Sequence, residues 1–363
     1  MARIELRELR KVYGRDIEAV KGLDLVVDEG EFVVLVGPSG CGKTTTLRMI
    51  AGFEEPTAGE IRIDGRVVND LEPRQRNLGM VFQGHALFPH KTVFENIEFG
   101  PRMKGVDAAT RQRRVREVAE LVRITPLLGK LPAQCSGGEA QRVALARTLI
   151  TEPSAFLLDE PLASLDAKLR REMRAEIDRL HEELRKTFLF VTHDQEEAMT
   201  LADRIVVMRD GRVEQVGAPL QIYNDPISHF VADFFGSPSM NLLPGKLHHA
   251  GGRPLFEGPG FTLALPALYS GTPEGRYTLG ARPEHLRVSA GDGSFQCRAK
   301  LVEPLGKDTL LYFEHGAERP TIAIVEGASA HRTGDALGIT FDPGRIYLFD
   351  AAGRRVRGGL PGR

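Results

Sequence analysis

A glycine-rich segment near the N-terminus constrains this chain more than any other part of its sequence. The segment follows the apolar run Phe32–Val36 and precedes the helical pattern Thr45–Ala51. Its residues are Gly37, Pro38, Ser39, Gly40, Cys41, Gly42, Lys43 and Thr44. Such a loop between a strand and a helix has the P-loop pattern, in which backbone N–H groups converge on phosphate oxygens. The helix presents its positive end to the same anion, so the sequence predicts a nucleotide-binding α/β domain.

The side chains of this loop have distinct predicted roles. Lys43 is expected to hold the β- and γ-phosphates, and Thr44 is expected to offer its hydroxyl to Mg²⁺. Thr45, the next residue, is also expected to contact the nucleotide. The alternative is an ordinary glycine-rich turn, which the strand before it and the helix after it argue against.

A second apolar run, Phe156–Leu158, ends in the carboxylates Asp159 and Glu160. A strand of this kind places its carboxylates at the carboxyl edge of the sheet, where α/β folds bind ligands. Asp159 is predicted to organise the Mg²⁺ site, and Glu160 to activate a water molecule against the γ-phosphate. Seen alone, the segment could equally be a strand followed by an exposed acidic turn.

The sequence pattern changes from about residue 240, and the boundary is placed at Gly236–Pro244. Before it, short apolar runs alternate with helix-periodic stretches such as Ala167–Lys186, which is typical of an α/β fold with a largely parallel sheet. After it, short β-like segments separated by Gly and Pro indicate a small β-barrel. These segments are Tyr277–Arg282, Gln296–Glu303, Thr309–Glu314 and Ala336–Phe341. The predicted domains are therefore 1–235 and 236–363.

Composition excludes several classes of protein. The 48 Lys and Arg residues nearly balance the 49 Asp and Glu residues, and the resulting net charge of −1 argues against bulk nucleic-acid binding. No apolar run is long enough for a membrane-spanning helix, and the first residues do not resemble a signal peptide. The three widely spaced cysteines suggest neither a disulfide framework nor a zinc site. We therefore expect a cytoplasmic protein.

Another segment makes the prediction more specific. Cys135, Ser136, Gly137, Gly138 and Glu139 precede the helical run Val143–Ile150. This segment resembles the signature motif of the ATP-binding cassette (ABC) family, commonly Leu-Ser-Gly-Gly-Gln. A helix capping box between the serine and the glutamate explains the same letters, and both interpretations can hold together. Two glycines at a helix start leave N–H groups free to bind an anion.

The resemblance to ABC proteins implies how two copies of the chain cooperate. In that family two cassettes pack head to tail, and the Ser136–Gly138 segment of one closes over ATP held by Lys43 of the other. ATP then holds the homodimer together, and hydrolysis releases it. Cys135 and Glu139 depart from the common motif. If Glu139 folds back onto its own helix, its charge points away from the γ-phosphate; otherwise closure of the dimer should be weakened.

The other family marks follow in the expected order. The resemblance implies that Tyr13 stacks on adenine and that Gln83 touches Mg²⁺ and the attacking water. It also implies that Ser164–Asp166 crosses the dimer interface and that His193 contacts the γ-phosphate. Each has an ordinary alternative: a core or surface tyrosine, a solvated glutamine, a helix N-cap and a structural histidine. The predicted catalytic residues are Glu160, His193 and Gln83.

The resemblance extends to one branch of the family. The stretches Phe235–Gly245 and Gly280–His285 look like the cassette exit and C-terminal barrel of maltose and glycerol-3-phosphate importers. This implies an ABC nucleotide-binding domain with a RecA-like core, an antiparallel β subdomain and a helical subdomain at about 84–150. An OB-like regulatory or dimerisation domain follows it. Expected partners are a second copy, two membrane permeases that the loop Gln83–His90 contacts and, indirectly, an external solute-binding protein. The chain would lie on the cytoplasmic face of the membrane and bind no nucleic acid.

Several alternatives stay open. The cargo could be a polyamine, sulfate or ferric iron, because the cassette sequence contains almost no information about the transported solute. A soluble ABC ATPase of DNA repair or translation is less favoured, since no coiled-coil or zinc insertion is present. The pair Gly84-His85 departs from relatives and could alter the permease contact. The basic stretch Arg102–Arg123 is interpreted as a solvated helix face in preference to a patch for an acidic partner.

Overall fold

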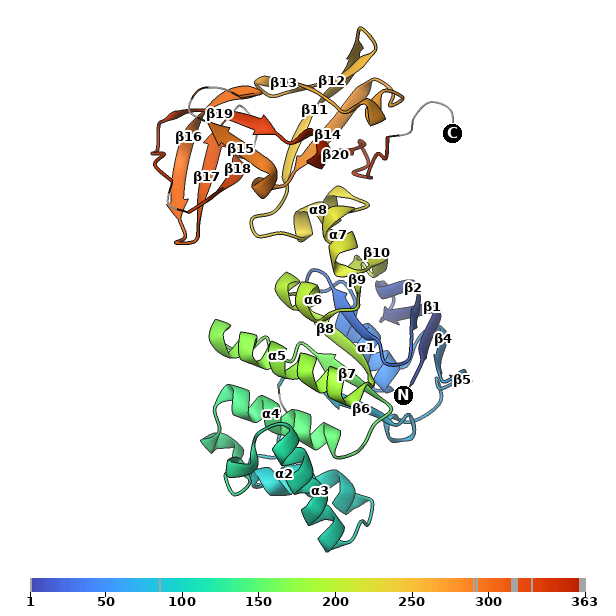
Figure 1. Ribbon diagram of the computed structural model, residues 1–363. Helices are drawn as coiled ribbons and strands as arrows, with labels where there is room; N and C mark the ends of the chain where they lie inside the picture. Colours follow the sequence, from blue (N-terminus) through green and yellow to red (C-terminus); the bar gives the residue numbers. More distant parts are fainter. Residues whose placement is uncertain are drawn as a thin grey trace. The chain divides into compact units, whose positions relative to one another are not determined.

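A computed structural model of the chain describes residues 2–84, 86–289, 291, 293–314, 319–327 and 329–358 (Figure 1). They form two compact units, Met1–Leu220 and Gln221–Arg363. The division precedes the expected boundary between residues 235 and 236. Among the described residues, no helix combines the length and apolarity that crossing a membrane requires.

A six-stranded sheet forms the centre of the first unit, with strand order β10-β9-β3-β8-β7-β6. The strands are β3 (Phe32–Val36), β6 (Leu78–Val81), β7 (Ala155–Asp159), β8 (Thr187–Thr192), β9 (Arg204–Arg209) and β10 (Arg212–Gly217). All neighbours are parallel except β10 and β9. Every residue of β3, β7 and β8 is buried, as continuous apolar strands covered on both faces require. The carboxyl ends of β3, β8, β7 and β6 therefore lie side by side.

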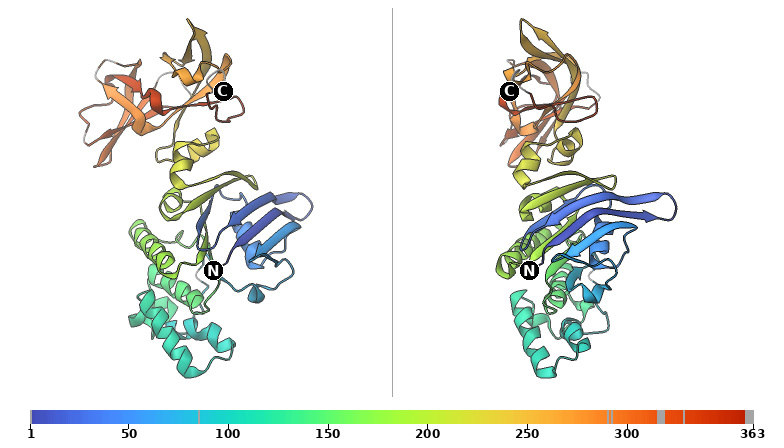
Figure 2. Two further views of the ribbon diagram at one scale, coloured as in Figure 1. Left: turned by 45° about the vertical axis from the view of Figure 1, so that its right-hand side comes forward. Right: turned by 90° about the vertical axis from the view of Figure 1, so that its right-hand side faces the viewer.

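A second, antiparallel sheet in this unit has the order β2-β1-β4-β5. Its strands are β1 (Ile4–Tyr13), β2 (Ile17–Val27), β4 (Ala58–Ile63) and β5 (Arg66–Val67). Figure 2 shows β1 and β2 as a long antiparallel hairpin. Ile4, Val20 and Ile61 of this sheet share one apolar core with Val33 of β3 and Leu47 of α1 (Lys43–Ala51). Because β3 and α1 both contribute to this core, the two ends of the loop between them are held in place.

Five helices complete the first unit. Three lie within the stretch assigned to the helical subdomain: α2 (Val93–Met103), α3 (Ala108–Leu121) and α4 (Gly137–Leu149). The others are α5 (Ala167–Leu184) and α6 (Gln195–Leu201). The predicted apolar stripe of α5 buries Met173, Ile177 and Leu180, and the helix ends at Arg185, whose φ of 52° stops the helical path.

The second unit is mainly β-structure, as the sequence predicts. It begins within α7 (Pro219–Asn224) and continues with α8 (His229–Phe234). Two five-stranded antiparallel sheets follow, with orders β13-β12-β11-β14-β20 and β15-β19-β16-β17-β18. Phe256 and Phe261 of the first sheet and Phe295, Phe313 and Phe341 of the second share one core. The strands are β11 (Asn241–Ala250), β12 (Arg253–Gly258), β13 (Phe261–Ala264), β14 (Gly275–Ala281), β15 (Leu286–Ser289), β16 (Phe295–Pro304), β17 (Asp308–Glu314), β18 (Thr321–Glu326), β19 (Ala336–Phe341) and β20 (Ile346–Phe349).

A fully buried arginine, Arg282, explains why residues 221–235 belong to the second unit. Its guanidinium donates hydrogen bonds to the carbonyls of Ala232 (3.1 Å), Phe235 and Tyr223 (2.8 Å). It also lies 3.9 Å from the centre of the Tyr223 ring. These contacts attach α7 and α8 to the β-rich unit. A boundary placed by the change in sequence pattern misses them, because the two helices resemble those of the first unit.

Candidate nucleotide site

The backbone of the loop after β3 requires glycine at two positions. Gly37 has a φ of 156° and Gly42 a φ of 101°, and both approach neighbouring backbone closely. A Cβ atom at Gly37 would lie 2.2 Å from the Met208 carbonyl oxygen, and one at Gly42 would lie 2.5 Å from that of Ala19. No other residue fits without moving the backbone. The backbone of β9 and β2 therefore packs directly against this loop.

Lys43 lies inside this loop and is only 4% exposed. Its ammonium donates hydrogen bonds to the carbonyls of Gly37 (2.7 Å) and Pro38 (2.9 Å). Among the described residues, no carboxylate lies within ion-pair distance of it. A buried cation without an anionic partner is costly, so the site favours a negatively charged ligand such as a phosphate. Cys41 contributes a buried thiol 3.7 Å from the ammonium, and burial raises the pKa of that thiol.

The start of α1 is left uncapped. Gly42 is its N-cap and provides no side-chain hydrogen bond, and the first turn carries no acidic residue. The first N–H groups of a helix have no partner within the helix, so those of Thr44 and Thr45 are available to an anion. The Thr45 backbone thus takes the position expected of it. The positive end of the helix dipole adds to the attraction.

Thr44 and Asp159, two residues predicted to bind Mg²⁺, lie in direct contact. The Thr44 hydroxyl donates a hydrogen bond of 2.8 Å to Asp159 Oδ1. Asp159 ends β7 and is nearly buried, which raises the pKa of its carboxyl, while the Thr44 hydrogen bond opposes that shift. A hydroxyl and a carboxylate are hard oxygen donors of the kind that Mg²⁺ prefers. These two residues therefore fit a Mg²⁺ ion.

Two predicted catalytic residues converge on one oxygen atom of the third, Glu160. The Gln83 amide donates to Glu160 Oε2 over 3.3 Å, and His193 Nδ1 lies 3.2 Å from the same oxygen. They follow the adjacent strands β6, β7 and β8, which explains why side chains far apart in sequence meet. Glu160 has a φ of 44°, and its N–H donates to the Val191 carbonyl. A non-glycine residue in this conformation is strained, so the surrounding sheet holds the carboxylate in place.

The segment resembling the signature motif caps its own helix. Ser136 is the N-cap of α4, and its hydroxyl accepts a hydrogen bond from the Glu139 N–H (3.3 Å). The Glu139 carboxylate in turn accepts one from the Ser136 N–H (2.7 Å), which holds the pKa of Glu139 below its usual value. The structure thus matches the first of the two arrangements expected for Glu139. Among the described residues, no hydrogen bond joins this segment to the loop that holds Lys43.

The glycines of this segment differ in their surroundings. Gly137 is exposed at the helix start. Gly138 is buried, and a Cβ there would lie 2.5 Å from a methyl group of Leu169 on α5. Gly138 is therefore needed for close packing, whatever it binds. This packing role was not predicted, because Leu169 lies 31 residues after Gly138 in the sequence.

Two further predicted positions lie apart from these groups. Tyr13 ends β1 with 36% of its surface exposed, and the Lys11 ammonium lies 5.0 Å from its ring centre. The ring thus has a free surface on which a base could stack. In the Ser164–Asp166 segment, Asp166 caps α5 by accepting hydrogen bonds from the N–H groups of Lys168 and Leu169. The ordinary N-cap interpretation of this segment is therefore correct, and a dimer role would be additional.

Sequence reasoning missed Arg147 on α4. Its guanidinium donates to the Ala86 carbonyl and lies 4.5 Å from the centre of the Phe88 ring. Burial lowers the pKa of this arginine. Arg147 thereby attaches the helix that begins at Ser136 to the loop that follows Gln83. Nothing in the sequence distinguishes it from other helical arginines; His85, in the same loop, lies outside the described residues.

Three stretches of the chain match known protein families. Residues 20–163 match the ABC transporter family model, residues 236–286 match a MalK OB fold domain, and residues 279–349 match a TOBE domain.

Similar proteins span nearly the whole chain. An sn-glycerol-3-phosphate import ATP-binding protein of Rhizobium johnstonii is 48% identical over 98% of this chain and 96% of its own length. A sulfoquinovosyl glycerol transport ATP-binding protein of Agrobacterium fabrum is 47% identical over 98% of this chain and 99% of its own. A lactose transport ATP-binding protein of Rhizobium radiobacter is 46% identical over 98% of this chain and 100% of its own length.

Solved structures resemble the first unit. The dimeric structure of a bacterial ABC transporter cassette matches with a TM-score of 0.55 and 36% identity, over 60% of this chain and 98% of that one. A post-hydrolysis cassette dimer bound to ADP and Pi matches with the same TM-score and 35% identity, over the same shares.

Proposed function

This chain belongs to the ABC transporter family of ATP-binding proteins, and we propose that it powers a bacterial importer of carbohydrates or glycerol phosphates. The observation that carries the proposal is the convergence of Gln83 and His193 on the Glu160 carboxylate beside a P-loop. The relatives named for sn-glycerol-3-phosphate, sulfoquinovosyl glycerol and lactose support a hydroxylated solute. They favour this cargo over polyamines, sulfate or iron, and favour transport over DNA repair or translation.

ATP binding follows from the loop and the helix start. Lys43 exchanges its two carbonyl partners for phosphate oxygens, which complete the charge pairing that the buried ammonium lacks. The uncapped N–H groups of α1 bind the same phosphates. Tyr13 offers its exposed ring to the adenine. The glycines and the short Ser39 side chain keep the loop close enough for backbone contacts.

Thr44 and Asp159 would hold Mg²⁺, and Gln83 would complete its surroundings. A bound Mg²⁺ neutralises charge that develops on the phosphates. The Thr44 hydroxyl, which donates to Asp159 here, would offer its oxygen to the metal. The raised pKa of Asp159 indicates that its burial disfavours the free carboxylate, so a divalent cation compensates directly.

Hydrolysis depends on the position of the Glu160 carboxylate. Glu160 accepts a proton from the attacking water, and Gln83 and His193 orient its Oε2 atom from two sides. The strained backbone of Glu160 fixes the carboxylate before ATP arrives, which reduces the reorganisation that the reaction needs. His193, more than half exposed, can then reach the γ-phosphate.

A second copy of the chain would complete the site. Ser136, Gly137 and Gly138 of one protomer supply N–H groups to the ATP held by its partner, and the cassette dimers among similar structures support this assembly. Two permease subunits would contact the loop after Gln83, so that the dimer lies peripherally at the cytoplasmic face of the membrane. An external solute-binding protein would deliver the solute. The second unit would regulate or stabilise the dimer.

The Glu160→Gln variant tests the proposal. It retains ATP and loses about 100-fold or more in ATPase rate, because the amide cannot accept the proton of water. With hydrolysis blocked, an ATP-bound dimer accumulates and is detected by size-exclusion chromatography. Glu172→Gln, on the exposed face of α5, is the matched control and keeps the wild-type rate. Wild-type turnover in Glu160→Gln would remove Glu160 from its role.

The solute is tested separately. The genes beside that of this chain are expected to encode a solute-binding protein, and calorimetry with that protein measures which solute it binds. Binding of a sugar or a glycerol phosphate supports the proposed cargo. Binding of a polyamine, sulfate or ferric iron contradicts it and leaves the ATPase assignment standing.

A further inference from the structure

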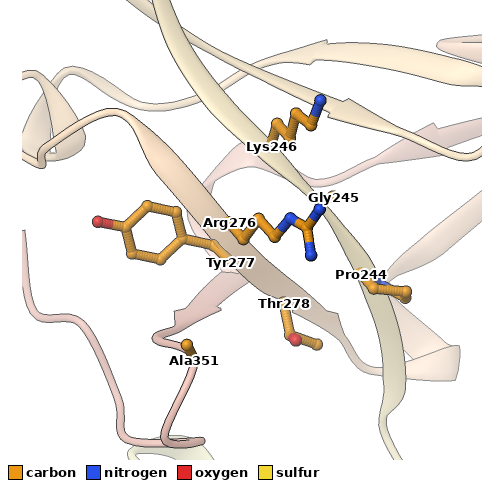
Figure 3. Close-up of a pocket in the computed structure, with 7 residues that line it drawn as sticks. All are labelled: Pro244, Gly245, Lys246, Arg276, Tyr277, Thr278 and Ala351. Atoms are coloured by element: carbon orange, nitrogen blue, oxygen red, sulfur yellow. The ribbon is translucent and has the colours of Figure 1, made fainter.

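A pair of adjoining cavities lies on one face of the sheet that contains β11 and β14. The first has a volume of about 410 Å³ and is lined by Lys246, Arg276, Thr278 and Ala351, together with Pro244, Gly245 and Tyr277 (Figure 3). The second, of about 440 Å³, shares Lys246 and Arg276 with the first. His248, Glu257 and Glu274 also line it. The two cationic side chains therefore stand where the cavities meet.

The cavities lie on the face that the core does not use. Leu243, Leu247 and Leu279 are buried in the core that the two sheets share. Residues of a strand alternate between its faces, so Lys246 and Arg276 point to the opposite side. In Figure 3 the Arg276 guanidinium extends toward β11 and the Tyr277 ring points away from it.

The two cations face each other at exposed positions and form no ion pair with the carboxylates of the adjoining cavity. Lys246 and Arg276 are direct partners in the β11–β14 register, and like charges directly opposite each other destabilise a sheet. Among the described residues, neither makes an ion pair. Glu257, the β12 partner of Lys246, does not lie within ion-pair distance of it. An anion between the two side chains would offset the repulsion between them.

The surrounding groups indicate which anion fits. Arginine presents a planar set of donors to phosphate oxygens, and lysine adds a mobile charge. The Thr278 hydroxyl on the same face can donate a further hydrogen bond. Each cavity falls in the range of small-molecule sites, roughly 300–1,000 Å³, and exceeds the space that one tetrahedral ion needs. In the adjoining cavity, the Glu257 carboxylate can accept hydrogen bonds from hydroxyl groups. Glu274 Oε1 already accepts a hydrogen bond of 2.7 Å from the His249 N–H, so Glu274 offers its other oxygen.

We propose that this face of the second unit binds the phosphate monoester of a small hydroxylated molecule. The phosphate lies between Lys246 and Arg276, and the hydroxyl groups extend toward Glu257 and Glu274. The site is separate from the nucleotide loop and uses none of its residues. It gives the second unit a means of sensing a phosphorylated metabolite.

Titration calorimetry on the full-length chain tests this site. The nucleotide loop is first filled with a non-hydrolysable ATP analogue and Mg²⁺, because it also binds phosphate. Glycerol 3-phosphate, inorganic phosphate and glycerol are then titrated separately. We expect glycerol 3-phosphate to bind, glycerol not to bind, and binding to weaken as salt is added. Binding of both phosphates with equal affinity would identify the phosphate group alone as the ligand and overturn the hydroxyl contacts.

A pair of matched variants locates the binding. Lys246→Gln with Arg276→Gln weakens glycerol 3-phosphate binding at least about tenfold, since both charged donors are lost. Arg287→Gln with Lys307→Gln removes the same charge from exposed positions elsewhere in this unit, and affinity stays within about twofold. Equal losses in both double variants, or no binding to the wild type, would overturn the proposal. Lys43→Ala, which alters only the nucleotide loop, retains the binding; its loss there would place the ligand at that loop.

Discussion

Two helices of the first unit begin with glycines and are expected to meet phosphate, yet their starts differ. The helix α1 begins after Gly42, which offers no cap, and carries no acidic residue in its first turn. The helix α4 begins after Ser136, whose capping box with the anionic Glu139 engages the N–H groups of Ser136 and Glu139 but not those of Gly137 and Gly138. The first start is open to an anion, whereas the second is partly satisfied by its own chain and carries a negative charge in its first turn.

This difference assigns the two starts different parts in ATP binding. The open start of α1, with the buried Lys43 beside it, is suited to bind nucleotide within a single protomer. The capped start of α4 competes with its own side chains for any phosphate. It is therefore suited to a weaker contact that forms only when a partner has already bound ATP. We therefore expect the nucleotide to bind first and the dimer to form second.

The largest expected effect contrasts Lys43 with Ser136. Lys43→Ala lowers the nucleotide affinity of the monomer by about 100-fold or more, as loss of a buried charged hydrogen-bond partner would. Ser136→Ala leaves that affinity within about twofold and weakens only the ATP-dependent dimer. Equilibrium binding of a fluorescent ATP analogue at low protein concentration measures the first effect, and analytical ultracentrifugation the second. Similar losses of monomer affinity in both variants would abolish the contrast.

A smaller effect separates the glycines of the two starts. Gly42→Ala forces a Cβ against the backbone of Ala19 at a positive φ and lowers the free energy of unfolding by about 3 kcal/mol. Gly138→Ala meets only the flexible Leu169 side chain and costs about 1–2 kcal/mol. Denaturant unfolding followed by circular dichroism compares them. Gly65→Ala, a turn glycine with open space around it, controls for strain from a positive φ alone. A larger loss for Gly138→Ala than for Gly42→Ala would reverse the expected order.

The smallest effect concerns the charge of Glu139. Glu139→Gln keeps a side chain that can cap Ser136 but removes the negative charge, so the ATP-dependent dimer tightens a few-fold while the helix start loses about 0.5 kcal/mol. Because the pKa of Glu139 is lowered in the folded chain, its stabilising contribution is complete above the usual glutamate pKa, about 4.3. It is lost as the pH falls through the lowered value.

The difference in melting temperature between Glu139→Gln and the wild type is therefore present at pH 7 and vanishes in acid. Differential scanning fluorimetry across the pH range measures it. A difference that grows as the pH falls would contradict the assigned sign of the pKa shift.

The sequence predicted the parts of the site that adjacent residues build. The P-loop, the strand that ends at Asp159 and the capping box at Ser136 and Glu139 each depend on a few consecutive residues. Local backbone and capping preferences are therefore enough to predict them. The β-rich second unit was also predicted, because its short strands and turns are local patterns.

Contacts between distant residues were beyond local reasoning. The apolar run ending in two carboxylates predicted Glu160, and the family resemblance implied Gln83 and His193. Only the strand order explains why Gln83 and His193 meet at one oxygen of Glu160. Arg282 decides where the second unit begins through hydrogen bonds to carbonyls of a preceding segment, and carbonyls carry no sequence signal. The packing of Gly138 against Leu169 was missed because the two residues lie far apart in the sequence.

The helix α4 has Ser136 at its start and Arg147 in its last turn. Ser136 and Arg147 are separated by roughly 16 Å of regular helix, at about 1.5 Å per residue. A helix transmits axial displacement with little compression. If a partner's ATP displaces Ser136, we therefore expect Arg147 to displace Ala86 in the same direction. The binding of a second nucleotide-bound protomer would then alter the loop that follows Gln83, the residue proposed to contact the attacking water.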